Sequence, residues 1–388
     1  MHLPKLPFRP ATLQLLIATS LTLSSLWSLQ AQAADAAAAQ TQPAHPVRPD
    51  AAIDSTIRHK VVETIANKMA ASYVFQDIGE KMAKALREHE KRGDYNQSGS
   101  ANAFGDLVTT HLREISHDKH IRVSYFTDVV EEDSPPGIRP SAAEMEKYAA
   151  AERYRNYGLA KFERLAGNIA LLELNGFSDP ELGGDVIASA MNMAANADAL
   201  IVDLRRNGGG DPAMVALVCS YLFEGEPVHL NDLYYRFDNA THQYWTQAFV
   251  PGKRFGGKKP VYVLTSERTF SGAEEFSYNL KNLKRATLIG ATTGGGANPG
   301  DMFKAGEHFA VFIPTGRAIS PITHTNWEGT GVTPDIAVPP DQALLTAQIL
   351  ATKAVLPKMS DPQMQGMLEN KLGQLQAELE KMKGAAAK

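Results

Sequence analysis

The stretch Ala199-Leu200-Ile201-Val202-Asp203-Leu204, followed at once by Asn207-Gly208-Gly209-Gly210, decides the fold class of this 388-residue chain. A largely apolar run of this length is typical of a strand that is buried on both faces, as in a parallel sheet. Similar runs occupy residues 169–174, 261–264 and 286–289. The chain is therefore expected to contain a sheet with several parallel strands.

Helical patterns lie between these runs, at residues 179–197, 214–223 and 272–283. Strands that alternate with helices predict a sheet with parallel pairs and helical cover. The fold class predicted from the sequence is therefore α/β.

The segments before and after this core are predicted to be helical. Residues 53–116 carry apolar side chains at four-residue spacing, which indicates a bundle of three short helices. An alternating strand is expected at 121–126. The tail, residues 363–382, has leucines at coiled-coil-like spacing, so it is either a helix packed on its own domain or the seam of a homodimer.

The composition excludes several classes of protein. Hydrophobic residues make up 44% of the chain and charged residues 21%, which is a globular balance. The net charge of −4 leaves no basic excess for nucleic acid. The single cysteine, Cys219, excludes an internal disulfide and a cysteine-rich zinc site.

The first residues have the pattern of a secretory signal peptide. Lys5 and Arg9 precede an apolar stretch, and Ala31-Gln32-Ala33 resembles a cleavage site. A secreted chain without disulfides fits a bacterial periplasm, with no stable membrane anchor after cleavage. The predicted organisation is a signal peptide (1–33), a linker (34–50), a helical domain (51–116), an α/β core (117–345) and a helical tail (346–388).

Ser271 follows a predicted strand and opens a predicted helix. Its hydroxyl would lie beside free backbone N–H groups and the positive end of the helix dipole, as a nucleophile requires. The same spacing, Ser271-Gly272-Ala273-Glu274, also fits a capping box, in which the serine only stabilises the helix start. Both interpretations remain open from spacing alone.

Three other groups could take part in chemistry. The loop of three glycines at 208–210 could bind an anion through its N–H groups, or be a plain tight turn. Several histidines and acids lie between His111 and His120, where a single general base is more economical than a metal site. Glu328 lies among glycines and an aromatic residue, and could orient an active centre or be an ordinary loop carboxylate.

Four blocks of sequence together resemble the C-terminal processing (tail-specific) serine peptidase family, in its interphotoreceptor retinoid-binding-protein-like and tricorn-like branch. They are DKHIRV, ALIVDLRRNGGGDP, VYVLTSERTFSGAEEF and TNWEGTGVTPDIAV. The resemblance covers about residues 53–350. It implies a crotonase-like ββα-repeat core, preceded by a helical domain. A short, charged, helical-looking segment follows the His120 strand, so no PDZ-like insert is expected.

The resemblance also implies roles for particular residues. Ser271 matches the nucleophile. Many family members use a lysine as base, but residues 291–296 contain none; the tricorn-like branch uses an upstream histidine and a downstream carboxylate, which match His120 and Glu328. Ser116-His117 offers the family's serine–histidine pair in another register, so His117 is the alternative base.

The oxyanion hole would be formed by Gly208 or Gly209 together with Gly272. The function implied is therefore a secreted serine peptidase that cleaves peptides or unfolded proteins without a cofactor or metal. The alternative is a non-catalytic module that binds an apolar, retinoid- or lipid-like ligand. A weaker alternative is binding of a phosphate or a nucleotide at the glycine loop.

Overall fold

The computed structural model describes residues 48–133 and 141–386. The predicted signal peptide and most of the predicted linker lie outside the described residues. The buried run at 199–203 forms the middle of a six-stranded sheet, in which all neighbouring strands are parallel except the edge pair β2–β3. Its order is β12 (Ile336–Ala337), β8 (Thr287–Gly290), β7 (Val261–Thr265), β4 (Ala199–Asp203), β3 (Ile169–Leu174) and β2 (Leu159–Leu165).

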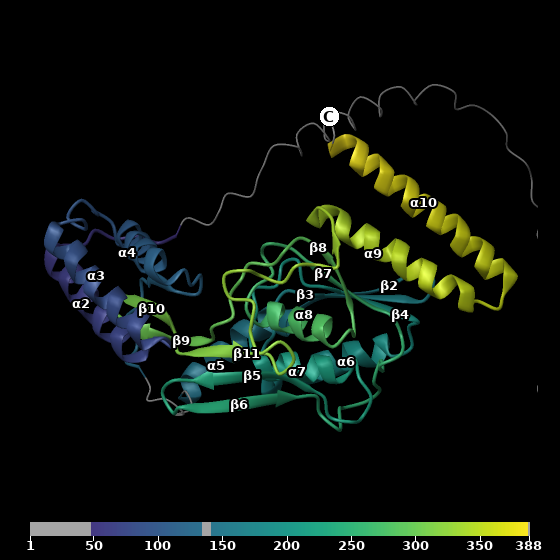
Figure 1. Cartoon of the computed structure of the whole chain (residues 1–388), viewed down its shortest axis with the longest axis horizontal. Coiled ribbons are helices and arrows are strands. Elements are labelled where there is room, and N and C mark those ends of the chain that lie inside the picture. Colours follow the sequence, from purple (N-terminus) through teal and green to yellow (C-terminus); the bar gives the residue numbers. More distant parts are fainter. Residues whose placement is uncertain (1–47, 134–140, 387–388) are drawn as a thin grey trace, which may run out of the picture. The chain divides into compact units, whose positions relative to one another are not determined.

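Helices cover both faces of this sheet (Figure 1). They are α6 (Pro180–Ala194), α7 (Pro212–Ser220), α8 (Gly272–Asn282), α9 (Pro340–Val355) and α10 (Pro362–Ala386). Leu200 and Val202 of β4 share a core with α6, α7 and α8. Ala199 and Ile201 point the other way, into a core with α9 and α10. This alternation explains why the whole strand is apolar.

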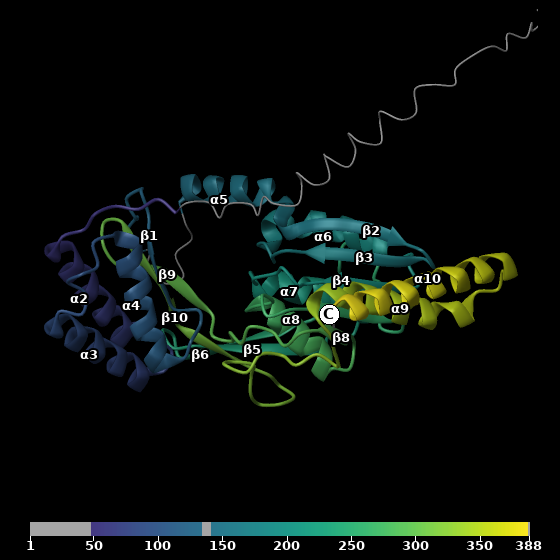
Figure 2. The ribbon, with the colours of Figure 1, turned by 90° about the horizontal axis from the view of Figure 1, so that it is seen from above.

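A second core forms around the N-terminal helices. It contains α2 (Ser55–Ser72), α3 (Gln76–Arg92), α4 (Ala101–Ser116) and a three-stranded antiparallel sheet of β1 (Arg122–Tyr125), β10 (Phe309–Pro314) and β9 (Gly300–Lys304). Figure 2 shows the late strands β9 and β10, in green, among the blue early elements. The helices therefore bury their apolar faces against strands that lie about two hundred residues further along the chain.

A third sheet and one further helix complete the fold. The sheet contains β11 (Gly316–Ile319), β5 (His229–Tyr235) and β6 (Ala240–Trp245). Helix α5 (Ala142–Tyr154) begins with a capping box between Ser141 and Glu144. It is the helical segment expected after the His120 strand.

Helix α10 uses its apolar stripe within the chain. Leu375 is buried against Leu345 and Ile349 of α9, and Leu372 and Leu379 pack beside them. The interpretation as a helix packed on its own domain therefore accounts for the leucine spacing. A dimer through this helix would need another surface.

The predicted α/β fold, with helices before and after the core, is confirmed. The three N-terminal helices and the strands at 169–174 and 199–203 lie where the periodicity places them. The described residues from Pro49 onward form one compact unit. Among the described helices, none is both long and apolar enough to cross a bilayer.

Candidate active site

Ser271 lies where β7 turns into α8, in a strained backbone conformation. Its φ is 54° and its ψ is −122°, a region that residues with a side chain rarely adopt. A Cβ placed on Gly209 would lie 2.7 Å from the Cβ of Ser271 and 2.9 Å from the nitrogen of Gly272. The glycine loop and the serine are therefore packed directly against each other, and only a glycine fits at position 209.

The predicted capping box is formed mainly by Glu274. Its Oε2 accepts a hydrogen bond from the N–H of Ser271 at 2.9 Å, whereas the Ser271 hydroxyl makes no well-formed capping bond to the helix. Glu274 also accepts from the N–H groups of Gly295 (2.6 Å) and Gly296 (2.8 Å). The start of α8 is thus fixed by Glu274, which leaves the serine hydroxyl available for chemistry.

The N–H groups of the glycine loop are not equivalent. Gly209 donates to Oδ1 of the buried Asn207 at 2.8 Å, so its N–H is already engaged. Within the described residues, the N–H groups of Gly208 and Gly272 have no hydrogen-bond acceptor. Of the three residues predicted for the oxyanion hole, Gly208 and Gly272 are free to donate in this structure and Gly209 is not.

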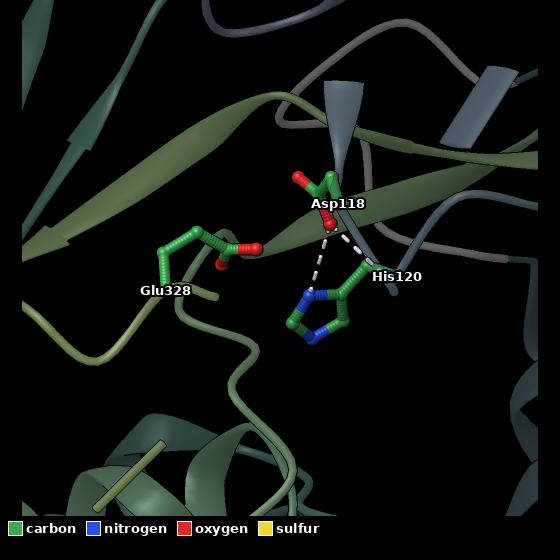
Figure 3. A group of neighbouring side chains, drawn as sticks. All are labelled: Asp118, His120 and Glu328. Atoms are coloured by element: carbon green, nitrogen blue, oxygen red, sulfur yellow. Dashed lines mark hydrogen bonds and ion pairs between the residues drawn. The ribbon is translucent and has the colours of Figure 1, made fainter. Parts of the chain in front are cut away.

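His120 lies just before β1, beside Asp118. Its backbone N–H donates to Oδ1 of Asp118 at 2.9 Å, and its ring Nδ1 lies 3.6 Å from the same oxygen (Figure 3). Asp118 is 1% exposed. A buried carboxylate at this distance favours a ring orientation in which Nδ1 carries the proton and Nε2 is free to act as a base.

Asp118 is itself held by residues from distant parts of the chain. Its Oδ2 accepts from the amide of Asn298 at 2.8 Å and from the hydroxyl of Tyr73 at 3.2 Å. Burial, followed by the charge of Asp118, raises the pKa of the Tyr73 phenol, so the phenol stays a donor. These donors stabilise a carboxylate in a buried place.

Glu328 lies on the other side of Asp118. Its Oε2 accepts from the N–H of Ala297, and its buried Oε1 has no partner among the described residues. Burial and the neighbouring charge of Asp118 raise the pKa of Glu328 to about 8. At neutral pH this group is therefore mostly protonated and can donate a hydrogen bond.

The side chains of Asp118, His120 and Glu328 form one cluster, with ligand atoms within 4.8 Å of one another. One imidazole nitrogen and two carboxylate oxygens could in principle hold a divalent cation. The same arrangement also suits a base and its orienting acids. The family resemblance implied that His120 and Glu328 act in one site, and the structure adds Asp118 to them.

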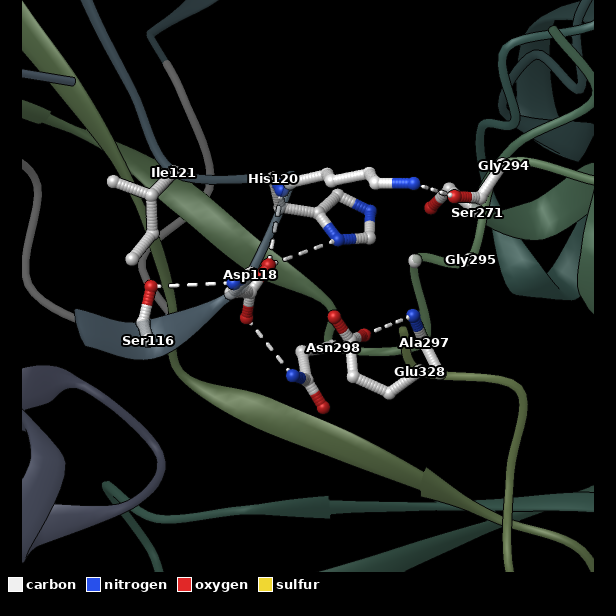
Figure 4. A network of polar contacts seen from close by, with 12 residues as sticks. Ser116, Asp118, His120, Ile121, Ser271, Gly294, Gly295, Ala297, Asn298 and Glu328 are labelled. Carbon is white, nitrogen blue, oxygen red and sulfur yellow. Dashed lines mark hydrogen bonds and ion pairs between the residues drawn. The ribbon is translucent and has the colours of Figure 1, made fainter. Parts of the chain in front are cut away.

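The His120 ring reaches the segment that carries the nucleophile. Its centroid lies 4.5 Å from that of Phe270, the residue before Ser271. Figure 4 shows the ring between Asp118 and the Ser271–Gly294 side of the site. Both ring nitrogens are buried and form no hydrogen bond within the described residues, so the contact between imidazole and hydroxyl is not made. Such bonds are often long in an unliganded enzyme.

The other histidines of this region lie elsewhere. His117 ends α4 in a left-handed conformation (φ 56°) and is exposed. His111 stacks on His89 with centroids 3.6 Å apart. Lys119, between Asp118 and His120, donates from Nζ to the carbonyl of Gly294 at 2.6 Å. Among these candidates, His120 is the histidine that the structure brings to the residue next to Ser271.

Sequence reasoning gave Asp118 no role of its own and missed Asn298 and Tyr73. For Asp118 a signal existed, because an acid two residues before a histidine can bond its backbone and face its ring. Asn298 and Tyr73 left no such signal, because their contacts with Asp118 join residues 180 and 45 positions apart.

Comparison with known proteins finds family models that match two segments of the chain. Residues 168–338 match the model described as peptidase family S41, and residues 55–154 match the N-terminal domain of Peptidase_S41 in eukaryotic IRBP. The tail-specific protease of Haemophilus influenzae is 32% identical over 142 residues, which cover 34% of this chain and 18% of that protein. The carboxy-terminal-processing protease of Bartonella bacilliformis is 28% identical over 187 residues, 45% of this chain and 40% of that protein.

Solved structures were also compared. A lipoprotein from Streptococcus agalactiae superposes with a TM-score of 0.49 at 15% identity, covering 78% of this chain and 98% of that one. The photosystem II D1 C-terminal processing protease gives a TM-score of 0.46 at 14% identity, covering 78% and 99%.

The two models that match the chain describe a peptidase family and its N-terminal domain. The chain belongs to peptidase family S41. The resemblance to this family, on which the residue roles were predicted, is thereby confirmed. The chain spans less than half of the length of the two curated relatives described above.

Proposed function

We propose that this protein is a serine endopeptidase that hydrolyses peptide bonds in peptides or unfolded proteins. Ser271 is the nucleophile and His120 the general base. The observation that carries this proposal is the strained Ser271, packed on the glycine loop, with the imidazole of His120 in contact with the ring of the residue before it. A serine hydroxyl needs a neighbouring base to attack a carbonyl.

The reaction divides into two halves. Ser271 Oγ attacks the carbonyl carbon while its proton passes to Nε2 of His120. The carbon–nitrogen bond then breaks, and His120 returns the proton to the leaving amine. Water, deprotonated by His120, hydrolyses the acyl-enzyme and restores the serine. The N–H groups of Gly208 and Gly272 stabilise the oxyanion, and losing one such donor typically costs about 10²–10³ in rate.

The two carboxyl groups have different tasks in this scheme. Asp118, fixed by Asn298 and Tyr73, holds the imidazole and stabilises the imidazolium that forms. The pKa of Glu328 is raised to about 8, so near pH 7 this group is mostly neutral. A neutral Glu328 avoids placing two like charges side by side in a buried site.

The alternative of an apolar carrier has less support. An apolar pocket of about 240 Å³ lies between α2 and the β9–β10 turn, lined by Ile53, Ile57, Tyr125 and Phe309 among others. Pockets for drug-sized ligands usually measure about 300–1,000 Å³. This pocket is small for a retinoid or a lipid, so it gives that alternative little weight.

The chain is proposed to act outside the cytoplasm, in a bacterial periplasm. The basis is the signal-peptide pattern of residues 1–33 together with the single cysteine. Residues 291–296 contain no lysine, which agrees with a histidine as the base, as in the tricorn-like branch.

Replacing Ser271 by alanine tests the proposal. We expect hydrolysis of an unfolded protein to fall at least about 10³-fold, because the variant has no hydroxyl at position 271 to attack the carbonyl. Circular dichroism and thermal unfolding should match the wild type, since the hydroxyl makes no well-formed capping bond. Unchanged turnover in the Ser271→Ala variant would refute the assignment.

A further inference from the structure

A pocket of about 480 Å³ adjoins the glycine loop and has not been used in the account so far. It is lined by Gly209 and Gly210, by Phe177 and Ser178, and by Glu152 and Arg155 with other residues. Gly209 touches Ser271, because a Cβ built on it would lie 2.7 Å from the serine Cβ. The pocket therefore begins at a residue that contacts Ser271, within reach of a substrate side chain near the scissile bond.

The walls of the pocket are fixed by hydrogen bonds between backbones. Phe177 donates to the carbonyl of Gly209 at 2.9 Å, and Asp211 donates to the carbonyl of Phe177 at 2.8 Å. Helix α5 contributes Glu152 from the other side. The pocket lies between a fixed strand edge and a helix. Its volume is within the usual range for ligand sites, so it can hold one side chain.

The charges around the pocket favour a cation. Glu152 is only 9% exposed, and its partner Arg155 bonds it loosely at 3.4 Å with a side chain that is 71% exposed. Asp179 and Asp211 directly follow the lining residues Ser178 and Gly210. Glu152 is the carboxylate that lines the pocket. Asp179 and Asp211 accept from the N–H groups of Glu181 and Ala213 at the starts of α6 and α7, and their charges act on the lining residue Tyr148.

Three further observations agree with a pocket that binds a basic side chain. After burial, the charges of Glu152, Asp179 and Asp211 raise the pKa of Tyr148, another lining residue, which indicates a negative field there. The hydroxyl of Ser178 is buried and has no hydrogen-bond partner among the described residues. The apolar surface for an aliphatic stem is the ring of Tyr148, which is 44% exposed.

We propose that this pocket binds the lysine or arginine side chain of a substrate residue next to the scissile bond, with Glu152 as its counter-ion. The proposal rests on the function proposed above. The stem of the substrate side chain lies on the ring of Tyr148, and its charged end displaces the exposed Arg155 from Glu152. An acidic substrate side chain would meet the buried carboxylate and be rejected.

Peptides that differ only in the residue beside the cleaved bond, as lysine, leucine or glutamate, test this. We expect kcat/KM to follow the order lysine, leucine, glutamate. The Glu152→Gln variant should lower the lysine-to-leucine ratio about tenfold, the usual size of a charge-assisted contact. Glu146→Gln is the matched control, because it removes the same charge from an exposed site on α5 outside the pocket.

Arg155→Gln sharpens the result, because removing the competing guanidinium should raise the lysine-to-leucine ratio. A ratio that is the same in wild type, Glu152→Gln and Arg155→Gln would overturn the proposal. So would a preference for leucine or glutamate in the wild type.

A binding experiment separates failure of the pocket from failure of the peptidase. Ser271→Ala protein is titrated with the fluorescently labelled lysine and leucine peptides, and anisotropy gives both Kd values. Tighter binding of the lysine peptide, lost in the Ser271→Ala/Glu152→Gln double variant, supports the pocket even if no peptide is cleaved. Equal Kd values would overturn the pocket proposal even if wild-type protein cleaves peptides.

Discussion

The proposed nucleophile, Ser271, and the proposed base, His120, lie beside two different hydrophobic cores. Ser271 opens α8, which packs on the six-stranded sheet together with α6 and α7. His120 precedes β1, whose core contains α2, α3 and α4. The Ser271 half combines a local contact, between Glu274 and the N–H of Ser271, with packing on Gly209 from the loop after β4. The second half depends on residues far apart in the chain. Substitutions in the His120 half should therefore reduce activity more than they reduce the stability of the fold.

The largest expected effect, apart from loss of the serine itself, comes from the base. His120→Ala should lower kcat at least about 10³-fold, since removing a member of a catalytic triad typically costs this much or more. His117→Ala is the matched control and should stay within about twofold, because that side chain is exposed at the end of α4. Steady-state kinetics with one peptide substrate show which of the two histidines is the base. A larger loss in His117→Ala would make His117 the base.

The next effect concerns the acid that holds the imidazole. Asp118→Asn keeps the shape of the side chain but removes its charge, so we expect kcat to fall about 10²–10³-fold with KM little changed. A merely structural role would instead lower the melting temperature and leave kcat per folded molecule intact. An Asp118→Asn variant with wild-type kcat would show that Glu328 alone serves the histidine.

The sequence predicted the surroundings of Ser271 well and those of His120 only in outline. The apolar run before Asn207 and the helix after Ser271 are local patterns, and they place the loop and the serine correctly. The engagement of the Gly209 N–H by Asn207 was also predictable, because asparagine often accepts from the N–H two residues on. The positive φ of Ser271 was not predictable, because it is imposed by packing on Gly209.

The support of His120 could not be predicted from local sequence. Asp118 owes its position to Asn298 and Tyr73, which come from other parts of the chain and show no pattern of their own. The burial of Glu328, and hence its raised pKa, depends equally on tertiary contacts. The strands β9 and β10, which pack in the N-terminal core, were not predicted, although residues 309–313 form an apolar run like those of the core strands.

The smallest expected effect is on stability, through Glu328. Its pKa rises from the usual 4.5 to about 8 on folding, so the folded state binds a proton more tightly than the unfolded state. Its contribution to the free energy of unfolding is present below pH 4.5 and is lost as the pH rises towards 8.

Glu328→Gln should remove about 1–2 kcal/mol of this pH dependence, a value reduced for partial exposure. Urea unfolding of both proteins at pH 5 and pH 8 measures it. Glu369→Gln, at an exposed position of α10, is the control and should leave the pH dependence unchanged. Identical pH profiles for wild type and Glu328→Gln would mean that Glu328 is ionised in the folded protein.

Labelling by a fluorophosphonate probe tests the central claim most directly, because the probe reacts only with an activated serine. We expect one label per chain, found by mass spectrometry on the peptide that contains Ser271, and a much slower reaction in His120→Ala. Absence of labelling in the folded wild-type protein, or equal labelling with and without the imidazole, would contradict the account.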